Sequence, residues 1–103
     1  MVRDQKRVKT MQYDVEMTDT FAGEANYCWV KRATVNMPEL IHYGYDGLTN
    51  YVRANRIYER ELMRKAKAAM GLTSVRGRKD SCGGVIEFHP FGSCTVMFIV
   101  PRY

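Results

Sequence analysis

From Gln12 onward, apolar and polar side chains alternate along the chain. The apolar positions of this first stretch are Tyr13, Val15 and Met17. A period of two is typical of a β-strand with one buried face. A second stretch runs from Asn26 to about Met37. Residues 18–25 between them include Gly23 and small polar side chains, which favour a turn or an extended loop. The pattern therefore predicts an antiparallel hairpin.

Most apolar positions of the second stretch share one parity. They are Tyr27, Trp29, Ala33, Val35 and Met37. Lys31 has the same parity and is the exception, which indicates a bulge or a sheet edge. Pro38 closes the strand, and we expect a loop over residues 38–47 because aromatic side chains are interrupted there by two glycines.

Residues 48–70 show the periodicity of an amphipathic helix. The apolar positions in its C-terminal half are Leu62, Met63, Ala66, Ala69 and Met70. Apolar side chains at spacings of three and four form one stripe on a helix, and basic residues fill the other faces. Gly71 suits the position just past the helix end, where Leu72 can fold back onto the last turn in a Schellman motif.

The C-terminal third has the pattern of β-structure. A short basic strand is expected over residues 74–79, a turn at 82–84, a strand over 85–89 and a turn at 90–93. Residues 94–100 are apolar on both parities, which is typical of a central strand with two covered faces. The sequence therefore predicts an α+β fold of order ββαβββ, an antiparallel sheet with one main helix, at about 48–70, packed on one face.

The length and composition are those of a single domain. The chain has 103 residues, of which 46% are hydrophobic and 26% charged. We expect a flexible basic tail over residues 1–10 and one α+β domain over 11–103. The modest core leaves self-association as a homodimer open. No apolar run approaches the roughly 20 residues of a membrane span and the N-terminus lacks a signal-like stretch, so we expect a cytoplasmic protein with no membrane partner.

The net charge of +5 is unevenly distributed. Residues 11–47 contain six acidic residues against Lys31 and Arg32, a net −4. Residues 48–70 contain six basic residues against Glu59 and Glu61, a net +4. The hairpin is therefore acidic and the helix basic, which gives a dipolar surface.

No combination of residues has the spacing of a catalytic or metal site. His42 and His89 are far apart and have no adjacent acid. The three cysteines, without a CxxC pair, do not suggest a disulfide framework or a zinc site, and we expect small buried or half-buried thiols. The sequence thus predicts a protein that is not an enzyme and that uses no cofactor or metal.

Basic residues recur every three or four positions along the expected helix. They are Arg53, Arg56, Arg60, Arg64 and Lys67. Three further bases in the next segment, Arg76, Arg78 and Lys79, extend the set. A basic ridge of this kind suits a nucleic acid or an acidic partner, and a solvated helix face explains the same pattern. A nucleic-acid-binding accessory protein is accordingly the second functional hypothesis.

Aromatic side chains favour protein recognition as the first hypothesis. The chain has seven Tyr, four Phe and one Trp, and Tyr and Trp dominate interface hot spots. The hairpin and the loop after it hold the candidate contact residues, which are Asp19, Glu24, Tyr27, Trp29, Tyr43 and Tyr45. An acidic hairpin would be steered toward a basic, nucleic-acid-handling surface on another protein.

Two segments resemble small proteins of bacteriophages and mobile elements. The first is DTFAGEANYCWV at residues 19–30, and the second runs from Arg64 through GLT at 71–73 to GSCTVMFI at 92–99. The resemblance implies a phage-borne protein that acts by stoichiometric binding to a host protein complex, as an inhibitor of the anti-CRISPR type. It supplies no site residues, and the inference is one of analogy.

Overall fold

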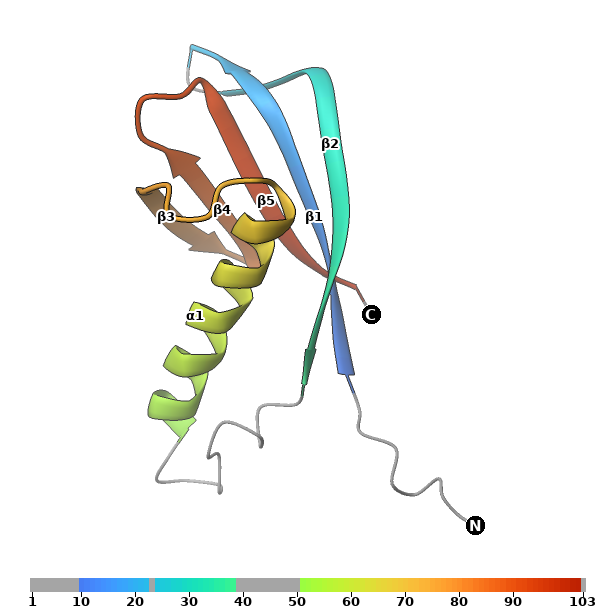
Figure 1. Ribbon diagram of the computed structural model, residues 1–103, viewed down its shortest axis with the longest axis vertical. Helices are drawn as coiled ribbons and strands as arrows, with labels where there is room; N and C mark the ends of the chain where they lie inside the picture. The colour runs from blue at the N-terminus through green and yellow to red at the C-terminus, as the bar shows by residue number, and fades with distance from the viewer. Residues whose placement is uncertain (1–9, 23, 39–50, 103) are drawn as a thin grey trace.

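The computed structural model describes residues 10–22, 24–38 and 51–102 of the chain (Figure 1). Five strands and one helix follow the predicted order ββαβββ. They are β1 (Thr10–Phe21), β2 (Glu24–Pro38), α1 (Tyr51–Ala69), β3 (Gly77–Cys82), β4 (Val85–Pro90) and β5 (Thr95–Arg102). The predicted α+β class, with one helix and an antiparallel sheet, is confirmed.

The sheet is open and fully antiparallel, with the strand order β2-β1-β5-β4-β3. The C-terminal strand β5 is central and pairs with β1 from Gln12↔Arg102 to Asp19↔Thr95. Its central place explains why residues of both parities are apolar, as the sequence indicates. Val96, which faces away from α1, and Ile99, which faces α1, are both almost inaccessible to solvent.

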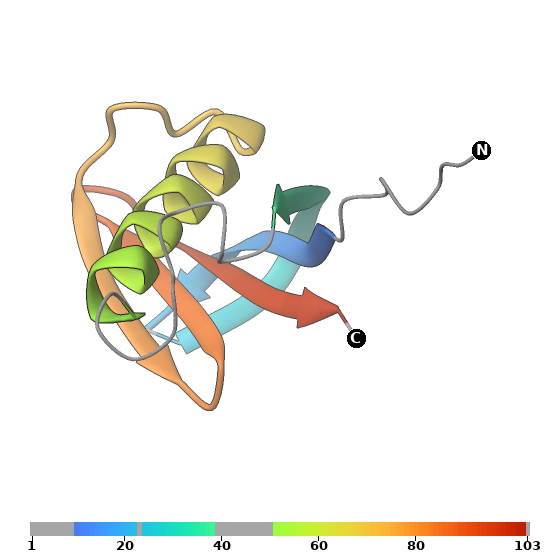
Figure 2. The same ribbon diagram turned by 90° about the horizontal axis from the view of Figure 1, so that it is seen from below.

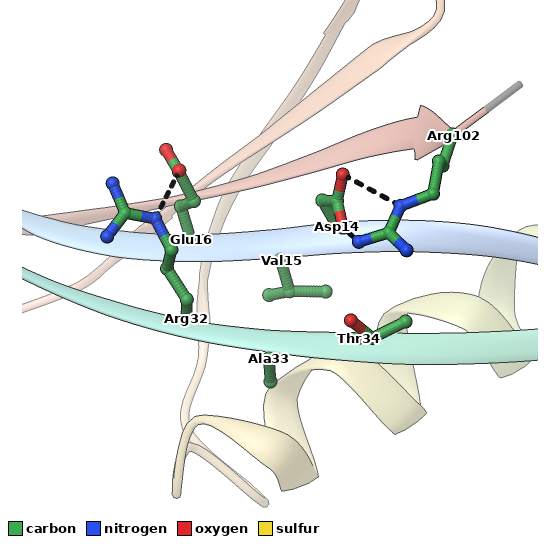
Figure 3. A pocket seen from close by; sticks show the side chains of 7 residues that line it. All are labelled: Asp14, Val15, Glu16, Arg32, Ala33, Thr34 and Arg102. Carbon is green, nitrogen blue, oxygen red and sulfur yellow. Dashed lines mark hydrogen bonds and ion pairs between the residues drawn. The ribbon is translucent and has the colours of Figure 1, made fainter.

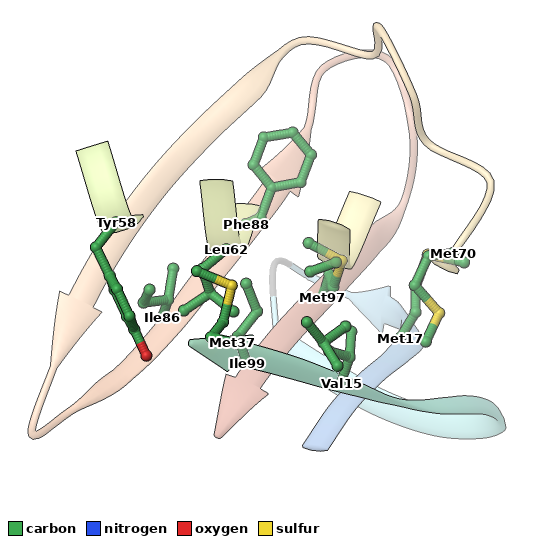
Figure 4. Packing of buried hydrophobic residues seen from close by; sticks show 12 residues of the cluster. Val15, Met17, Met37, Tyr58, Leu62, Met70, Ile86, Phe88, Met97 and Ile99 are labelled. Carbon is green, nitrogen blue, oxygen red and sulfur yellow. The ribbon is translucent and has the colours of Figure 1, made fainter. Parts of the chain in front are cut away.

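The helix packs on one face of the sheet and encloses the core (Figures 2 and 4). Its buried residues recur every four positions, at Ala54, Tyr58, Leu62 and Ala66. They meet the side chains of one parity from four strands. These are Val15 and Met17 of β1, Val35 and Met37 of β2, Met97 and Ile99 of β5, and Ile86 and Phe88 of β4.

The helix ends as the sequence predicts. Gly71 adopts a φ of 75°, its N–H bonds to the carbonyl of Ala68 at 3.2 Å, and the N–H of Leu72 bonds to the carbonyl of Lys67 at 2.7 Å. This is the hydrogen-bond pattern of a Schellman motif. The helix begins at Tyr51, and the predicted start at residue 48 lies outside the described residues.

Two contacts on opposite flanks fix the rotation of α1 about its axis. Lys65 Nζ donates to the backbone carbonyl of Asn36 on β2 at 3.0 Å. On the other flank, Lys79 Nζ of β3 lies 3.6 Å from Glu59 Oε1. At 100° per residue, Lys65 stands about 40° to one side of the centre of the buried stripe and Glu59 about 80° to the other side. The face of α1 that points away from the sheet is therefore fixed as well.

Several boundaries differ from the sequence prediction. The hairpin strands extend to Phe21 and restart at Glu24, so the connection is a short turn, one of the two predicted forms, and is narrower than residues 18–25. The short basic strand lies at Gly77–Cys82 and not at 74–79. Ser74 has a φ of 72°, a left-handed conformation that cannot continue a strand. Among the described residues, no helix is long and apolar enough to cross a membrane.

Candidate functional site

Three aromatic side chains project from the end of the β1–β2 hairpin. Phe21 is 75% exposed, Tyr27 56% and Trp29 44%. Large aromatic side chains are normally buried, so their concentration at one end of the sheet distinguishes this surface. The prediction that Tyr27 and Trp29 lie on the buried face with Ala33, Val35 and Met37 is wrong, because both residues are exposed.

A bulge interrupts the register of β2 in this segment. The two strands pair regularly as far as Thr18↔Val30, and pairing resumes at Thr20↔Ala25. The four residues 26–29 of β2 therefore lie opposite the single residue Asp19 of β1. Tyr27 has a φ of 59°, the left-handed region, which turns the chain outward. For Lys31 the sequence indicated a bulge or a sheet edge. Lys31 is in register with Met17 and β2 is an edge strand, so the second alternative is confirmed.

The side chain of Asp19 holds the bulge in place. Its carboxylate accepts hydrogen bonds from Asn26 Nδ2 and from the backbone N–H of Cys28, each at 2.9 Å. The bond from Asn26 is the main cause that keeps the pKa of Asp19 below its ordinary value of 3.8, with smaller contributions from Cys28 and Thr18. Asp19 is therefore a positioning residue, whereas the sequence suggested it as a contact residue.

Thr18 anchors the same bulge from beneath. Its side chain is completely buried, and its hydroxyl donates to the backbone carbonyl of Trp29 at 2.8 Å. Asp19 Oδ1 lies farther from that hydroxyl, at 3.2 Å, so the single hydroxyl proton is directed mainly to Trp29. The backbone on both sides of Tyr27 is thus tied to β1.

A second turn lies at the same end of the sheet (Figure 1). The N–H of Thr20 donates to the carbonyl of Cys94 at 2.9 Å, which places the β4–β5 turn beside the end of β1. Phe91 in this turn is 68% exposed. Sequence reasoning missed Phe91, although its place between Pro90 and Gly92 is that of a surface turn.

The remaining hairpin predictions have mixed outcomes. Glu24 is exposed next to the turn, opposite Phe21. Cys28 and Cys94 are exposed free thiols, so the expectation of buried or half-buried thiols is wrong for these two. Tyr43 and Tyr45 lie outside the residues that the structure describes. The hairpin-end surface, defined here as Phe21, Tyr27 and Trp29, is accordingly more apolar than the sequence suggested.

The predicted basic ridge is only partly assembled. A groove of about 470 Å³ is lined by Arg56, Arg60, Arg64 and Lys67 of α1, Lys79 of β3, and the side chains of Glu59 and Met63. We call the five cations of this groove the α1–β3 basic groove. Arg53 and Arg76 are exposed but do not line it.

Arg78 lies on the opposite face of the sheet from Lys79. Alternation along β3 separates these two neighbours, because Lys79 pairs with Glu59 of α1, whereas Arg78 Nε donates to Asp80 Oδ2 at 3.0 Å. Placing Arg78 on the ridge is therefore incorrect. Alternation along the strand was the signal that could have excluded it.

Charges on the open face of the sheet are balanced in pairs (Figure 3). Arg32 Nε lies 2.9 Å from Glu16 Oε2, and Arg102 Nε lies 3.3 Å from Asp14 Oδ2. Hydrogen bonding to Asp14 raises the pKa of Arg102 above its usual value. These residues border a hollow of about 400 Å³. With two cations and two carboxylates, the hollow has no charge left over for a ligand.

Comparisons with known proteins give no match. No protein-family model matches the chain, and neither a curated protein nor a solved structure does. The functional argument therefore depends on the surfaces described above.

Proposed function

We propose that this protein is not an enzyme and acts by stoichiometric binding to another protein through the hairpin-end surface. The observation that carries the proposal is the exposure of three aromatic side chains at the hairpin end, Phe21 at the end of β1 and Tyr27 and Trp29 on a bulge whose backbone is tied to β1. Exposed aromatic side chains are the usual anchors of protein interfaces, because each buries a large apolar area at a small cost in rotamer entropy.

The rigidity of the bulge supports binding over a purely structural role. Association costs free energy for every side chain and loop that must be ordered. Asp19 and Thr18 already hold the backbone at Cys28 and Trp29 through hydrogen bonds, so much of this ordering precedes contact with a partner. A preorganised aromatic surface is the arrangement that gives high affinity per unit area.

The partner in this proposal is a host protein complex. The resemblance of residues 19–30 to phage-borne proteins supports a host target, and inhibition of the anti-CRISPR type is the form that such binding takes in this proposal. Glu24 beside the aromatic residues adds a negative charge at the rim, where it would favour a basic partner surface.

Affinity capture from a bacterial host lysate tests the proposal. The full chain is compared with the variant Phe21→Ser with Trp29→Ser, and with the control Val52→Ser with Ile57→Ser. The control removes two exposed apolar side chains from α1. We expect a protein that the wild type and the control retain and the hairpin variant loses. The purified partner should then bind at a fixed stoichiometry in calorimetry.

Equal retention of that protein by the hairpin variant would contradict the proposal. Circular dichroism of all three proteins serves as the folding check. Because the substituted side chains are exposed, we expect their spectra and thermal midpoints to agree closely.

A further inference from the structure

The basic side chains of α1 form a ladder with a regular step. Arg56, Arg60 and Arg64 follow one another at intervals of four residues, and Lys67 comes three residues later. At 1.5 Å per residue, four residues advance about 6 Å along the helix axis and the whole ladder spans about 17 Å. The step is close to the separation of successive phosphates along one nucleic-acid strand.

The ladder forms one wall of a groove. Lys79 of β3 and the apolar side chain of Met63 line the same groove. Lys67 Nζ sits 5.1 Å above the ring centroid of Phe88, a cation–π contact that positions the ammonium without neutralising it. Because Lys65 and Glu59 fix the rotation of α1, these cations face the groove in the folded protein.

The charge of the groove is incompletely balanced. Arg64 bonds to Glu61, and this contact lowers the pKa of Glu61. Lys79 pairs with Glu59. No carboxylate within the described part of the chain pairs with Arg56 or Arg60. The arginines of the open sheet face differ, since Arg32, Arg78 and Arg102 each have a carboxylate partner. The uncompensated charge thus centres on Arg56 and Arg60.

We infer that the α1–β3 basic groove binds the phosphate backbone of a single nucleic-acid strand that lies along α1. Arginine suits this ligand because its planar guanidinium donates two parallel hydrogen bonds to phosphate oxygens. The regular spacing of the arginines matches the regular spacing of phosphates in a nucleic-acid strand. Carboxylates on the surface of a folded protein are spaced irregularly and match it less well. The groove holds only cations, one carboxylate and Met63, so binding is indifferent to base sequence.

Fluorescence anisotropy with a labelled oligothymidylate tests this inference, using the full chain over a range of salt concentrations. Single-stranded binding should weaken with a log–log slope of about −0.7 per phosphate contacted, or about −3 for four contacts. The variant Arg56→Gln with Arg60→Gln should flatten the slope by about 1.4. With the same slope, each lost contact should lower the affinity about fivefold at roughly 0.1 M salt. The double variant should therefore bind the oligothymidylate about 25-fold more weakly than the wild type.

The matched control is Arg32→Gln with Arg78→Gln. It changes the net charge by the same amount but removes arginines that have carboxylate partners outside the groove. We expect its affinity to stay within about twofold of the wild type, because distant charges are screened at this ionic strength. Phe21→Ser with Trp29→Ser, the variant that tests protein binding, should also leave DNA binding unchanged.

Four results would overturn the inference. They are an equal loss of affinity in the two arginine variants, no measurable binding of the oligothymidylate, tighter binding of duplex than of single-stranded DNA, and binding of poly-glutamate as tight as that of DNA. The first would mean that net charge alone matters. The last would point to an acidic protein as the ligand.

Discussion

The carboxylate of Asp19 on β1 accepts a 2.9 Å hydrogen bond from the backbone N–H of Cys28 on β2, at the position where the two strands lose their register. The same carboxylate bonds to the side chain of Asn26, and Tyr27 between these two residues adopts a left-handed backbone conformation. One side chain of β1 thus shapes the part of β2 that exposes Tyr27 and Trp29.

Replacement of Asp19 by alanine should loosen the bulge while the sheet remains folded. The N–H of Cys28 loses its acceptor, so its amide hydrogen should exchange faster with solvent. Amide exchange measured by NMR checks this, with Val15 in the centre of the sheet as the internal reference. Glu24→Ala, an exposed acid in the same hairpin, is the control and should leave exchange at Cys28 unchanged.

The hydrogen bonds of Asp19 should also make stability depend on pH. The pKa of Asp19 is lower in the folded protein than its ordinary value of 3.8, so its contribution is fully present above that value. The contribution is lost as the pH falls through the lowered folded pKa, where the carboxylate becomes protonated.

Urea unfolding of the wild type and Asp19→Asn at a series of pH values measures this effect. We expect the wild type to be more stable above pH 3.8, and the difference to shrink below it. A difference in unfolding free energy that stays constant across this window would contradict the assigned role of the ionised carboxylate.

The phenol groups of Tyr13 and Tyr58 should be energetically coupled. Their hydroxyl oxygens lie 2.9 Å apart and tie β1 to α1, and their ring centroids lie 6.5 Å apart. Each single change to phenylalanine should cost about 1 kcal/mol, because the remaining half-buried hydroxyl loses a partner.

A double-mutant cycle measured by urea unfolding checks the coupling. The variant with both changes should be less destabilised than the sum of the single variants, by about 0.5–1 kcal/mol. Strict additivity would mean that the hydroxyl pair does not stabilise the fold.

Gly77 should not tolerate a side chain. A Cβ atom at this position would stand 2.3 Å from the carbonyl oxygen of His89 and 2.8 Å from the ring of Phe88. Since the nearer neighbour is backbone, relief requires β3 and β4 to shift, and we expect Gly77→Ala to cost about 2 kcal/mol. Thermal unfolding monitored by circular dichroism checks this. Arg76→Ala, at the exposed preceding residue, should leave the midpoint nearly unchanged.

The helix and the central strand were predictable because local patterns determine them. The spacing of Leu62 and Ala66, followed by Gly71, defines a helix and its end whatever the rest of the chain does. Apolar residues of both parities around Met97 predict a central strand, and β5 is the middle strand of the sheet. The predicted cover of both faces is wrong, because α1 covers one face and Val100 on the other face is exposed. Arg56 and Arg60 were also found from periodicity alone, and they do share a groove.

The hairpin end was not predictable in the same way. The conformation of Tyr27 depends on an acceptor that the neighbouring strand supplies, and strict alternation placed Tyr27 and Trp29 on the buried face, whereas both are exposed. The pair formed by Asp14 and Arg102 joins residues 88 positions apart, so only the β1–β5 register reveals it. The same register places Cys94 beside the end of β1.

The sequence by itself determined the order of elements, the buried stripe of α1 and the presence of a basic ridge, because each depends on a period of two or of about 3.6 residues. Only the tertiary structure decided which side chains meet across strands. In the folded protein Arg78 and Lys79 lie on opposite faces of the sheet, and Asp19 forms hydrogen bonds to the bulge. The aromatic side chains of the hairpin end are exposed to solvent. Strand register and positive backbone angles depend on partners distant in the chain, which no local period records.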